Sequence, residues 1–439
     1  MTTTSSFPSE KTTLSYWMGE ADRPLAKHRS TEELPEEVDI LIIGSGLSGA
    51  GAAFNLLVEY GTDKSVMLLE ARDVCSGATG RNGGHMRSYY YLKQDEYVKN
   101  FGEEVAADLC MFEHYELDKI EELTKKYDID YNFKRRRAFH AYEDEEAAAT
   151  GQRDYDAFVK NPFIPQDVKD SVNVVYGEEA QKEYNTVKLG GFTPASSLWP
   201  YKLVTGLLKV ALEKGLNLQT NTPVRELDLL EDKTWLVKTP RGSVRAKKVI
   251  ATTNAYTRAI LPEFNDKITP LKGVVSHLKS ESGKSLDVNM IHLFSGEDDY
   301  ISVCHDGSLI IGGGGETYEE SPNKEMMVDC LDDSFFPDET GKYFVDYPTR
   351  NYKSLANEKF VNDYTWTGCR GYSYDEFPFV GDLSEFGRPN LYVSAGFSGH
   401  GMPRVFSCAA YVSELAIGKN PTVKVPAPFK VSAERMNKE

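Results

Sequence analysis

The sequence is poor in cysteine, has no long apolar run and carries fewer positive than negative side chains. Its six cysteines are scattered over 439 residues without a CxxC pair, which argues against a zinc site or a redox disulfide and predicts reduced thiols. Because no run of about 18 apolar residues occurs, no membrane span is expected. Lys and Arg number 50 against 67 Asp and Glu, and the net charge of −17 disfavours nucleic acid and anionic membranes as partners.

Recognisable targeting signals are also absent. The first residues, MTTTSSFPSEK, do not form a basic segment followed by an apolar one, and the last four, MNKE, differ from the peroxisomal SKL signal. Together with the scattered cysteines, this leads us to expect a cytoplasmic protein without a metal site.

The composition is that of a folded protein, with 40% hydrophobic and 11% aromatic residues, and the length suits two or three domains. Residues 1–37 are polar and are expected to lie as an arm over the surface. The apolar runs 38–44 and 65–71 flank a helical pattern at 49–61, which predicts a strand–helix–strand unit. A further long helix is expected at 94–127.

A glycine-rich turn, GSGLSG, joins the first predicted strand to its helix. In this context the glycines match the dinucleotide-binding fingerprint: Gly44 permits the tight turn, Gly46 lets the backbone approach the pyrophosphate, and Gly49 lets helix and strand pack closely. Glu70 ends the next strand, and its carboxylate is expected to accept the ribose hydroxyls. The alternative is a tight turn followed by a solvated glutamate. The predicted contacts are Gly44, Gly46, Leu47, Ser48, Gly49, Glu70, Ala71 and Arg72.

A second glycine-rich stretch, SGATGRNGGH at residues 76–85, follows the second predicted strand. We refer to it as the second cradle. Its glycines permit close backbone approach to a flat or anionic group, and FAD, which extends beyond its ADP half, needs such a second contact region. Arg81 and Asn82 between the glycines indicate a positioned polar pair, whereas the alternative is a mobile surface loop. The predicted contacts are Thr79, Gly80, Arg81, Asn82, Gly83, Gly84 and His85.

Three stretches, VDILIIGSGLSGAGAAFNLL, LLEARDVCSGATGRNGGH and NLYVSAGFSGHGM, together resemble the FAD-dependent D-amino-acid oxidase superfamily. This group includes glycine oxidase, sarcosine oxidase and γ-glutamylputrescine oxidase. The second cradle and the SYW near the N-terminus are most similar to the γ-glutamylputrescine-oxidase-like branch, and WTGCRGYSYDEFPFVG resembles a further segment of that family. The resemblance covers both ends of the chain and patches of its middle.

The resemblance implies an α/β fold with an α+β insert: a Rossmann-like FAD-binding domain of the glutathione-reductase type and a substrate domain built on an antiparallel sheet. The β-rich patterns at 268–312 suit that second sheet. The expected units are an N-terminal arm at 1–37, an FAD-binding domain at 38–95, 196–262 and 365–439, and a substrate-binding domain at 96–195 and 263–364.

The resemblance also implies roles for particular residues. The second cradle would run along the pyrophosphate up to the isoalloxazine, and Val224 would meet the adenine. The segment 397–402 would bring backbone N–H groups to the pyrimidine end of the flavin, through Gly399, Gly401 and Met402.

Candidate catalytic residues are Arg87, His400 and Lys272. Arg87 matches a basic residue that sarcosine oxidases hold near the flavin, and the alternative is a surface ion pair. Lys272 is expected to face the substrate cavity. Cys369 matches a flavin-linking cysteine, but an inert buried thiol is the favoured alternative.

The function implied is FAD-dependent oxidation of the C–N bond of an amine or amino acid. Hydride would pass to flavin N5 and the resulting imine would hydrolyse, with H2O2 formed where oxygen, the expected acceptor, is used. The strand SLIIGGGG lacks the oxygen-activating lysine of sarcosine oxidases, so a dehydrogenase using another acceptor is one alternative. A non-redox binding protein with the dinucleotide fold is another. The particular substrate and the oligomeric state stay open.

Overall fold

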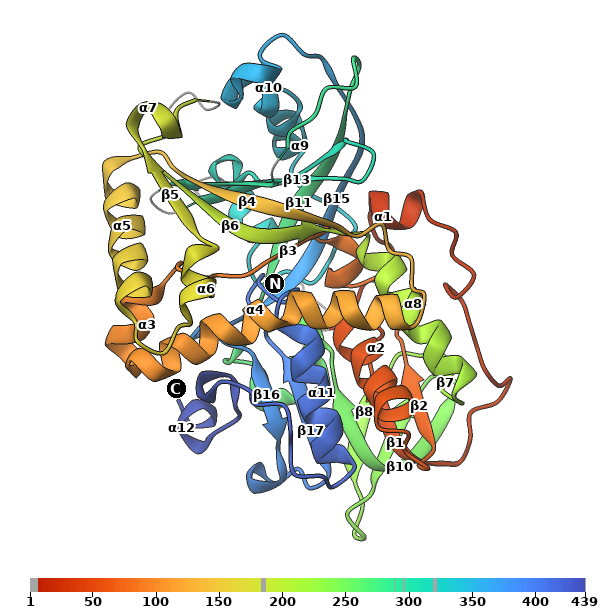
Figure 1. Cartoon of the computed structure of the whole chain (residues 1–439). Helices are drawn as coiled ribbons and strands as arrows, with labels where there is room; N and C mark the ends of the chain where they lie inside the picture. Colours follow the sequence, from red (N-terminus) through yellow and green to blue (C-terminus); the bar gives the residue numbers. More distant parts are fainter. Residues whose placement is uncertain (1–6, 183–186, 288, 295–296, 319–321, 439) are drawn as a thin grey trace.

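The computed structural model describes residues 7–182, 187–287, 289–294, 297–318 and 322–438, and it contains two large sheets (Figure 1). The first sheet has the strand order β16-β17-β10-β1-β2-β7. Strand β1 pairs in parallel with β2 and β10, β2 with β7, and β10 with β17, whereas β16 runs antiparallel to β17. The hairpin β8–β9 extends this sheet from β10. The strands are β1 (Glu37–Ile43), β2 (Val66–Leu69), β7 (Asn217–Gln219), β8 (Glu226–Leu229), β9 (Trp235–Thr239), β10 (Gly242–Ala251), β16 (Phe379–Asp382) and β17 (Leu391–Ala395).

The apolar strands of the first sheet are covered on both faces, as their continuous hydrophobic runs require. Ile40 and Ile42 of β1 pack into a core with helices α2 (Leu47–Phe54), α8 (Pro200–Glu213) and α11 (Val405–Ala416). The alternate residues Leu41 and Ile43 face a second core formed with β9, β10 and β16. The predicted strand–helix–strand unit is therefore confirmed, with α2 continuing into a π-helical turn at Asn55–Glu59.

The second sheet has the order β15-β11-β14-β13-β12-β4-β6-β3, with β5 paired to β6. Its pairings are antiparallel apart from that of β12 with β4. This confirms the expected α/β fold with an antiparallel second layer. The strands are β3 (His85–Arg87), β4 (Lys134–Tyr142), β5 (Asn173–Tyr176), β6 (Leu189–Ser197), β11 (Ile268–Ser280), β12 (Asn289–Phe294), β13 (Glu297–Val303), β14 (Leu309–Gly313) and β15 (Phe360–Ser373). The predicted domain boundaries divide this sheet, since 38–95 includes β3, residue 196 falls inside β6 and residue 365 falls inside β15.

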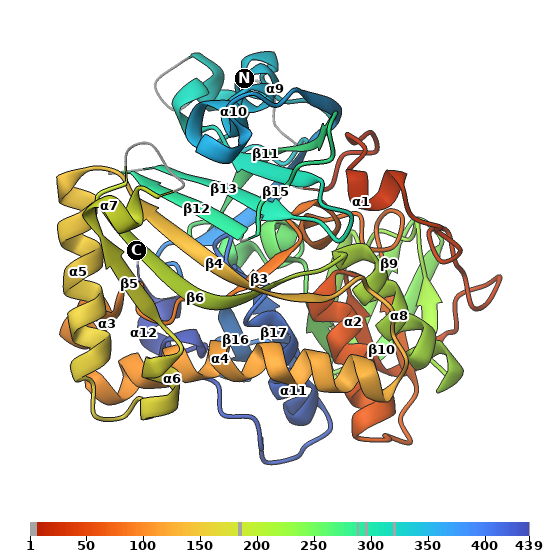
Figure 2. The ribbon, with the colours of Figure 1, turned by 45° about the horizontal axis from the view of Figure 1, so that its top comes forward.

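The helix expected at 94–127 is two helices, because Gly102 adopts φ 85° between them. The second of these, α4, crosses the front of the molecule in Figure 1, while α5 flanks the second sheet in Figure 2. In the described part of the chain, no helix has the length and apolar character that a bilayer span requires. The remaining helices are α1 (Tyr16–Gly19), α3 (Gln94–Phe101), α4 (Glu103–Lys126), α5 (Glu145–Lys160), α6 (Gln166–Asp170), α7 (Gly177–Ala180), α9 (Asp338–Val345), α10 (Tyr347–Asn351) and α12 (Ala433–Met436).

The N-terminal arm differs from the expectation of a segment laid over the surface. Ser15, Tyr16, Trp17 and Met18 are all buried, at 0–4% exposure. The Tyr16 ring stacks on His277 of the second sheet, with ring centroids 3.8 Å apart. Two aromatic rings and a thioether in succession are too apolar to remain in water, so this part of the arm enters the interior.

Candidate active site

A cavity is lined by both sheets and by all three glycine-rich segments. Members of the stretches 44–48, 77–89 and 397–405 contribute to its wall, together with residues of β11 and β15. Segments that are about 350 residues apart in sequence therefore meet at one place, as the sequence predicted. Of the predicted site residues, Gly49, Gly80, Gly84 and Lys272 do not line the cavity, and the others do.

The first glycine turn has the geometry that its motif predicts. Gly44 lies in the left-handed region at φ 103°, and a Cβ atom on Gly49 would lie 1.8 Å from the carbonyl oxygen of Gly44. Gly46 is the N-cap of α2, so the N-terminus of this helix opens at the cavity wall. Amide groups and a helix dipole in this position favour an anionic ligand such as a pyrophosphate.

Glu70 lies at the carboxyl end of β2 and faces the first glycine turn. One carboxylate oxygen accepts hydrogen bonds from Ser45 N at 2.8 Å and Ser45 Oγ at 2.6 Å, and the other accepts from Arg72 N at 2.9 Å. These bonds hold the carboxylate in the cavity wall, where it can accept further hydrogen bonds from ligand hydroxyls.

The glycines of the second cradle serve packing as well as ligand approach. A Cβ on Gly80 would lie 2.0 Å from the carbonyl oxygen of Cys75, and one on Gly84 would meet the Trp17 ring at 2.3 Å. Neither residue lines the cavity, whereas Gly77 and Gly83 do. The expectation that every glycine here admits a ligand is therefore too broad, because two of them admit neighbouring parts of the protein.

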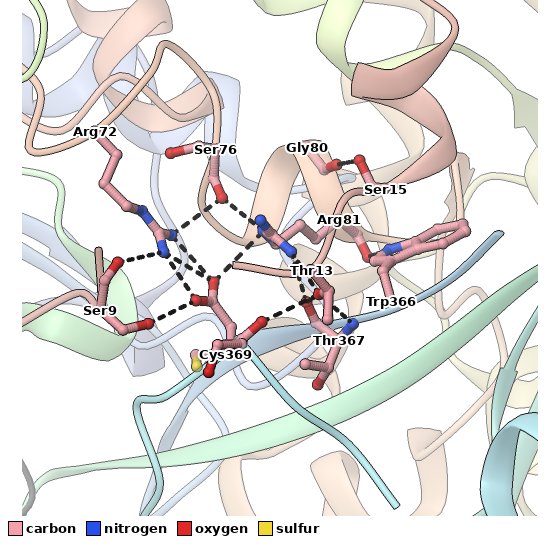
Figure 3. A network of polar contacts seen from close by, with 12 residues as sticks. Ser9, Thr13, Ser15, Arg72, Ser76, Gly80, Arg81, Trp366, Thr367 and Cys369 are labelled. Carbon is pink, nitrogen blue, oxygen red and sulfur yellow. Dashed lines mark hydrogen bonds and ion pairs between the residues drawn. The ribbon is translucent and has the colours of Figure 1, made fainter. Parts of the chain in front are cut away.

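In the cavity wall, the half-buried Arg72 and the buried Arg81 meet one carboxylate (Figure 3). Arg72 donates from both terminal nitrogens to Asp333, with Nη1–Oδ1 at 2.8 Å and Nη2–Oδ2 at 3.1 Å. Arg81 Nε lies 3.5 Å from Asp333 Oδ2 and donates to the carbonyl of Ser76 at 2.7 Å. Two guanidinium groups against one carboxylate leave an excess positive charge beside the cavity, which suits a phosphate ligand. Asp333 was not found from the sequence, because nothing in its local pattern marks it.

Several donors and acceptors in the cavity wall have no partner in the part of the chain that the structure describes. They are Arg81 Nη2, His85 Nδ1, and Arg87 Nε and Nη1. Buried polar atoms of this kind normally find a partner, so the wall is prepared for a ligand rich in hydrogen-bonding atoms. Together with the helix N-terminus and Glu70, this set of residues fits a dinucleotide with a polar ring system.

Arg87 makes no ion pair with any described residue, and its guanidinium lies 5.1 Å from the centroid of the Tyr89 ring. The alternative of a surface ion pair is thus not seen. The neighbouring His85 packs edge-on against Tyr300 with ring centroids 5.1 Å apart. Burial, aided by the charge of Arg87, lowers the pKa of His85 to about 3, so its imidazole is neutral at neutral pH.

His400 is held by a buried carboxylate from α4. Its Nε2 atom lies 3.0 Å from Glu113 Oε2, and its ring stacks on Tyr89 with centroids 3.6 Å apart. Glu113 also accepts from Arg404 Nε at 2.6 Å and from Tyr89 N at 2.6 Å. Burial raises the pKa of Glu113, but the charges of Arg404 and His400 outweigh it and hold the pKa to about 2. Burial lowers the pKa of His400 to about 4.

Glu113 was not predicted as a site residue from the sequence, although its position in the helix pattern could have indicated a buried, paired carboxylate. It lies next to Phe112 and one turn before Leu117, within the apolar stripe of α4. A charged side chain in such a stripe is buried only when it is paired.

Lys272 does not face the cavity, contrary to expectation. Its ammonium donates to the carbonyls of Asp332 at 2.9 Å and Phe335 at 2.8 Å, and it lies 3.7 Å from the Phe335 ring centroid. A buried ammonium needs such acceptors, and here they lie outside the cavity. Among the described residues, no lysine lines the cavity.

Cys369 does line the cavity, but its thiol is engaged by the protein. Its Sγ donates to the carbonyl of Cys330 at 3.6 Å, and burial raises its pKa to about 12. A thiol in this state is protonated at neutral pH and is a poor nucleophile. Val224, the predicted adenine contact, lines the cavity together with Pro223.

Known proteins are similar to this chain in both sequence and fold. The sequence profile of the FAD dependent oxidoreductase (DAO) family matches residues 39–415. Gamma-glutamylputrescine oxidoreductase of Escherichia coli is 26% identical over 424 residues, covering 92% of this chain and 89% of its own length. Probable oxidoreductase OrdL of Haemophilus influenzae is 26% identical over 415 residues, covering 90% and 86%. Glycine oxidase from Geobacillus kaustophilus has a similar structure, with a TM-score of 0.73 at 18% identity over 91% of this chain and 99% of that one. The chain therefore belongs to the DAO family of FAD-dependent oxidoreductases.

Proposed function

We propose that this oxidoreductase oxidises the bond between carbon and nitrogen in an amine or amino acid, giving an imine that water hydrolyses. Bound FAD supplies the hydride-accepting N5 atom for this chemistry. The names of the relatives support the substrate class: one is a gamma-glutamylputrescine oxidoreductase and one a glycine oxidase, and L-amino acid deaminase from Proteus myxofaciens shares the fold with a TM-score of 0.71.

The observation that supports the proposal most strongly is the chemical character of the cavity wall around Arg87. Here the Nε and Nη1 atoms of Arg87 have no hydrogen-bond partner among the described residues, and the guanidinium lies among aromatic rings and imidazoles that burial keeps neutral. Hydride leaves the α-carbon only when the neighbouring nitrogen has a free lone pair, so the substrate amine must lose its extra proton. A positive charge in a buried site lowers the pKa of a nearby amine and favours that neutral form. Arg87 can also bind a carboxylate or carbonyl oxygen of the substrate.

We assign the cofactor contacts on the same basis. The N-terminus of α2 at Gly46 would bind the pyrophosphate, Glu70 the ribose and Val224 the adenine, while the segment 397–402 would meet the pyrimidine end of the flavin. The first sheet would form a Rossmann-like nucleotide domain and the second sheet the roof over the substrate. The six cysteines are all free and buried, which supports action in the reducing cytoplasm.

Anaerobic titration tests this function. The purified yellow protein is mixed with polyamines, γ-glutamyl amines, N-methyl amino acids and D-amino acids, and the visible flavin absorbance is followed. At least one class is expected to bleach the flavin, and Arg87→Met is expected to slow that reduction by about 10²-fold. If dithionite bleaches the flavin and no amine does, the proposal is wrong. A colourless protein that does not take up FAD would favour the non-redox alternative.

A dehydrogenase that uses another electron acceptor is the second candidate. It is favoured by the lack of lysine both in β14, whose sequence is LIIGG, and elsewhere in the described cavity wall. Mixing the reduced enzyme with air-saturated buffer separates the two functions. An oxidase returns to yellow within its turnover time and forms H2O2, whereas a dehydrogenase stays bleached until an artificial acceptor such as a quinone is added.

A further inference from the structure

We propose that the N-terminal arm (residues 7–20) is a structural part of the FAD site, in which Ser15 and Trp17 hold the second cradle in its binding conformation. The inference concerns the binding of FAD and is independent of which substrate is oxidised.

Three consecutive carbonyl groups of the second cradle each accept a hydrogen bond from a distant side chain. Ser15 Oγ donates to the carbonyl of Gly80 at 2.6 Å, and Trp17 Nε1 donates to that of Asn82 at 2.7 Å. Between them, Trp366 Nε1 of β15 donates to the carbonyl of Arg81 at 2.8 Å. The backbone from 80 to 82 begins in a single 3₁₀ turn (Ala78–Arg81) and is held from outside that turn by the arm and by β15.

The orientation of these carbonyls determines the orientation of the next amides. All peptide bonds of the described chain are trans, and in a trans peptide the C=O of one residue and the N–H of the next point to opposite sides. Holding three carbonyls toward the arm and β15 turns the N–H groups of Arg81, Asn82 and Gly83 away from them. These three residues line the cavity. Successive amides fixed in this way bind acceptor atoms without further reorganisation, as an anionic or polar ring system of FAD requires.

The arm follows the cavity over much of its length. Phe7 and Pro8 line the cavity, and the guanidinium of Arg225, next to the predicted adenine contact, lies 4.6 Å from the Phe7 ring centroid. Farther along, Thr13 Oγ1 accepts from Thr367 N at 3.0 Å (Figure 3). The arm therefore contacts the neighbourhood of both ends of the predicted cofactor position.

The arm is anchored independently of any ligand. Trp199 Nε1 donates to the carbonyl of Trp17 at 2.8 Å, and the Tyr16 ring stacks on His277. Because these partners are the N-cap residue of α8 and a residue of β11, the position of the arm does not depend on FAD, so the second cradle is preorganised rather than formed by the ligand.

The test is the affinity for FAD, measured by adding FAD to apoprotein and following the loss of flavin fluorescence. The double variant Ser15→Ala/Trp17→Phe removes the two donors and leaves a smaller, apolar side chain at each position. We expect the dissociation constant to rise about 10- to 100-fold, because two cradle carbonyls lose their partners and the amides behind them lose their fixed orientation.

Tyr364→Phe is the matched control. Its hydroxyl donates to Glu20 Oε1 at 2.7 Å, so the variant removes one hydrogen bond between the arm and β15 without touching the cradle. Its FAD affinity should equal that of the wild type. Ser15→Ala alone removes a single oxygen and should weaken FAD binding about 5-fold. If the double variant does not fold, this single variant still tests the inference. Unchanged FAD affinity in folded Ser15→Ala, or an equal loss in Tyr364→Phe, would overturn the inference.

Discussion

The first two of the three glycine-rich segments at the cavity are held in different ways. In the first turn, the close contact between Gly49 and the Gly44 carbonyl lies within the motif itself, and the flanking strand and helix are its neighbours in sequence. In the second cradle, the backbone is fixed by Ser15, Trp17 and Trp366, which are remote in the chain. The structure of a local motif can therefore be predicted from the sequence together with its function. For a segment that distant residues stabilise, the sequence shows which residues it contains but not which residues hold it in place.

Breaking the first turn should have the largest effect. In Gly49→Ala the added Cβ would lie 1.8 Å from the Gly44 carbonyl oxygen, so strand and helix must separate. We expect a loss of about 3 kcal/mol or more in unfolding free energy and failure to retain FAD. Gly77→Ala is the control, because nothing lies within 4 Å of its Cβ position, and it should fold normally. Denaturant unfolding and the flavin content of purified protein measure both; a stable, yellow Gly49→Ala would contradict the assigned packing.

Removing the charge beneath the second cradle should have the next largest effect. Asp333→Asn leaves the buried Arg81 and the half-buried Arg72 without this carboxylate, and removing one partner of a buried ion pair costs about 3–5 kcal/mol. The melting temperature should fall accordingly. Asp346→Asn breaks an exposed helix pair with Arg350 and should leave the melting temperature unchanged. Similar shifts for the two variants would show that Asp333 does not support the cradle.

The third glycine-rich segment, at 397–405, extends the comparison, because it is held by α4. This helix carries two buried carboxylates one turn apart, Glu113 and Glu116. Glu113 holds His400 and has a lowered pKa of about 2, so its contribution to stability is complete above its ordinary pKa of 4.5 and is lost as the pH falls toward 2. Glu113→Gln should therefore cost roughly 3 kcal/mol at pH 7, and the difference from the wild type should shrink as the pH falls below 4.5.

Glu116 is the matched control for this pH dependence. It accepts from Phe406 N and Ser407 N at the start of α11, and burial raises its pKa. A carboxyl with a raised pKa in the folded state favours stability at low pH and loses that contribution as the pH rises. The difference between Glu116→Gln and the wild type should thus change with pH in the opposite direction. The test is to measure the unfolding free energies of the wild type and both variants between pH 7 and pH 3. If the two differences from the wild type change with pH in the same direction, the opposite pKa shifts assigned to Glu113 and Glu116 are wrong.

The smallest effect is expected at Cys369. Because its thiol is buried and protonated, we expect FAD to be bound without a covalent link, and Cys369→Ala should cost about 1 kcal/mol. Acid precipitation of the wild type and of the variant should release all yellow colour into the supernatant. Colour that stays with the wild-type pellet and leaves the Cys369→Ala pellet would instead establish a thioether.

Much of the fold and part of the site could be predicted from the sequence. The first strand–helix–strand unit and the placement of Glu70 followed from local patterns, whereas the convergence of the three glycine-rich segments followed from the resemblance to FAD-dependent oxidases. The long helix, however, is broken at Gly102, and residues 15–18 of the arm are buried rather than superficial. Lys272 was expected to face the substrate cavity, yet its ammonium is bound by carbonyl groups outside the cavity.

The sequence by itself determined where strands, helices and tight turns form, because side-chain periodicity and the need for glycine at crowded positions act between near neighbours. The tertiary structure alone decided that Asp333 would meet Arg72 and Arg81, that Glu113 would hold His400, and that Trp17 would fix the second cradle. The physical reason is that a buried polar group must find a partner within about 3 Å. That partner can come from any part of the chain, and no local pattern specifies which.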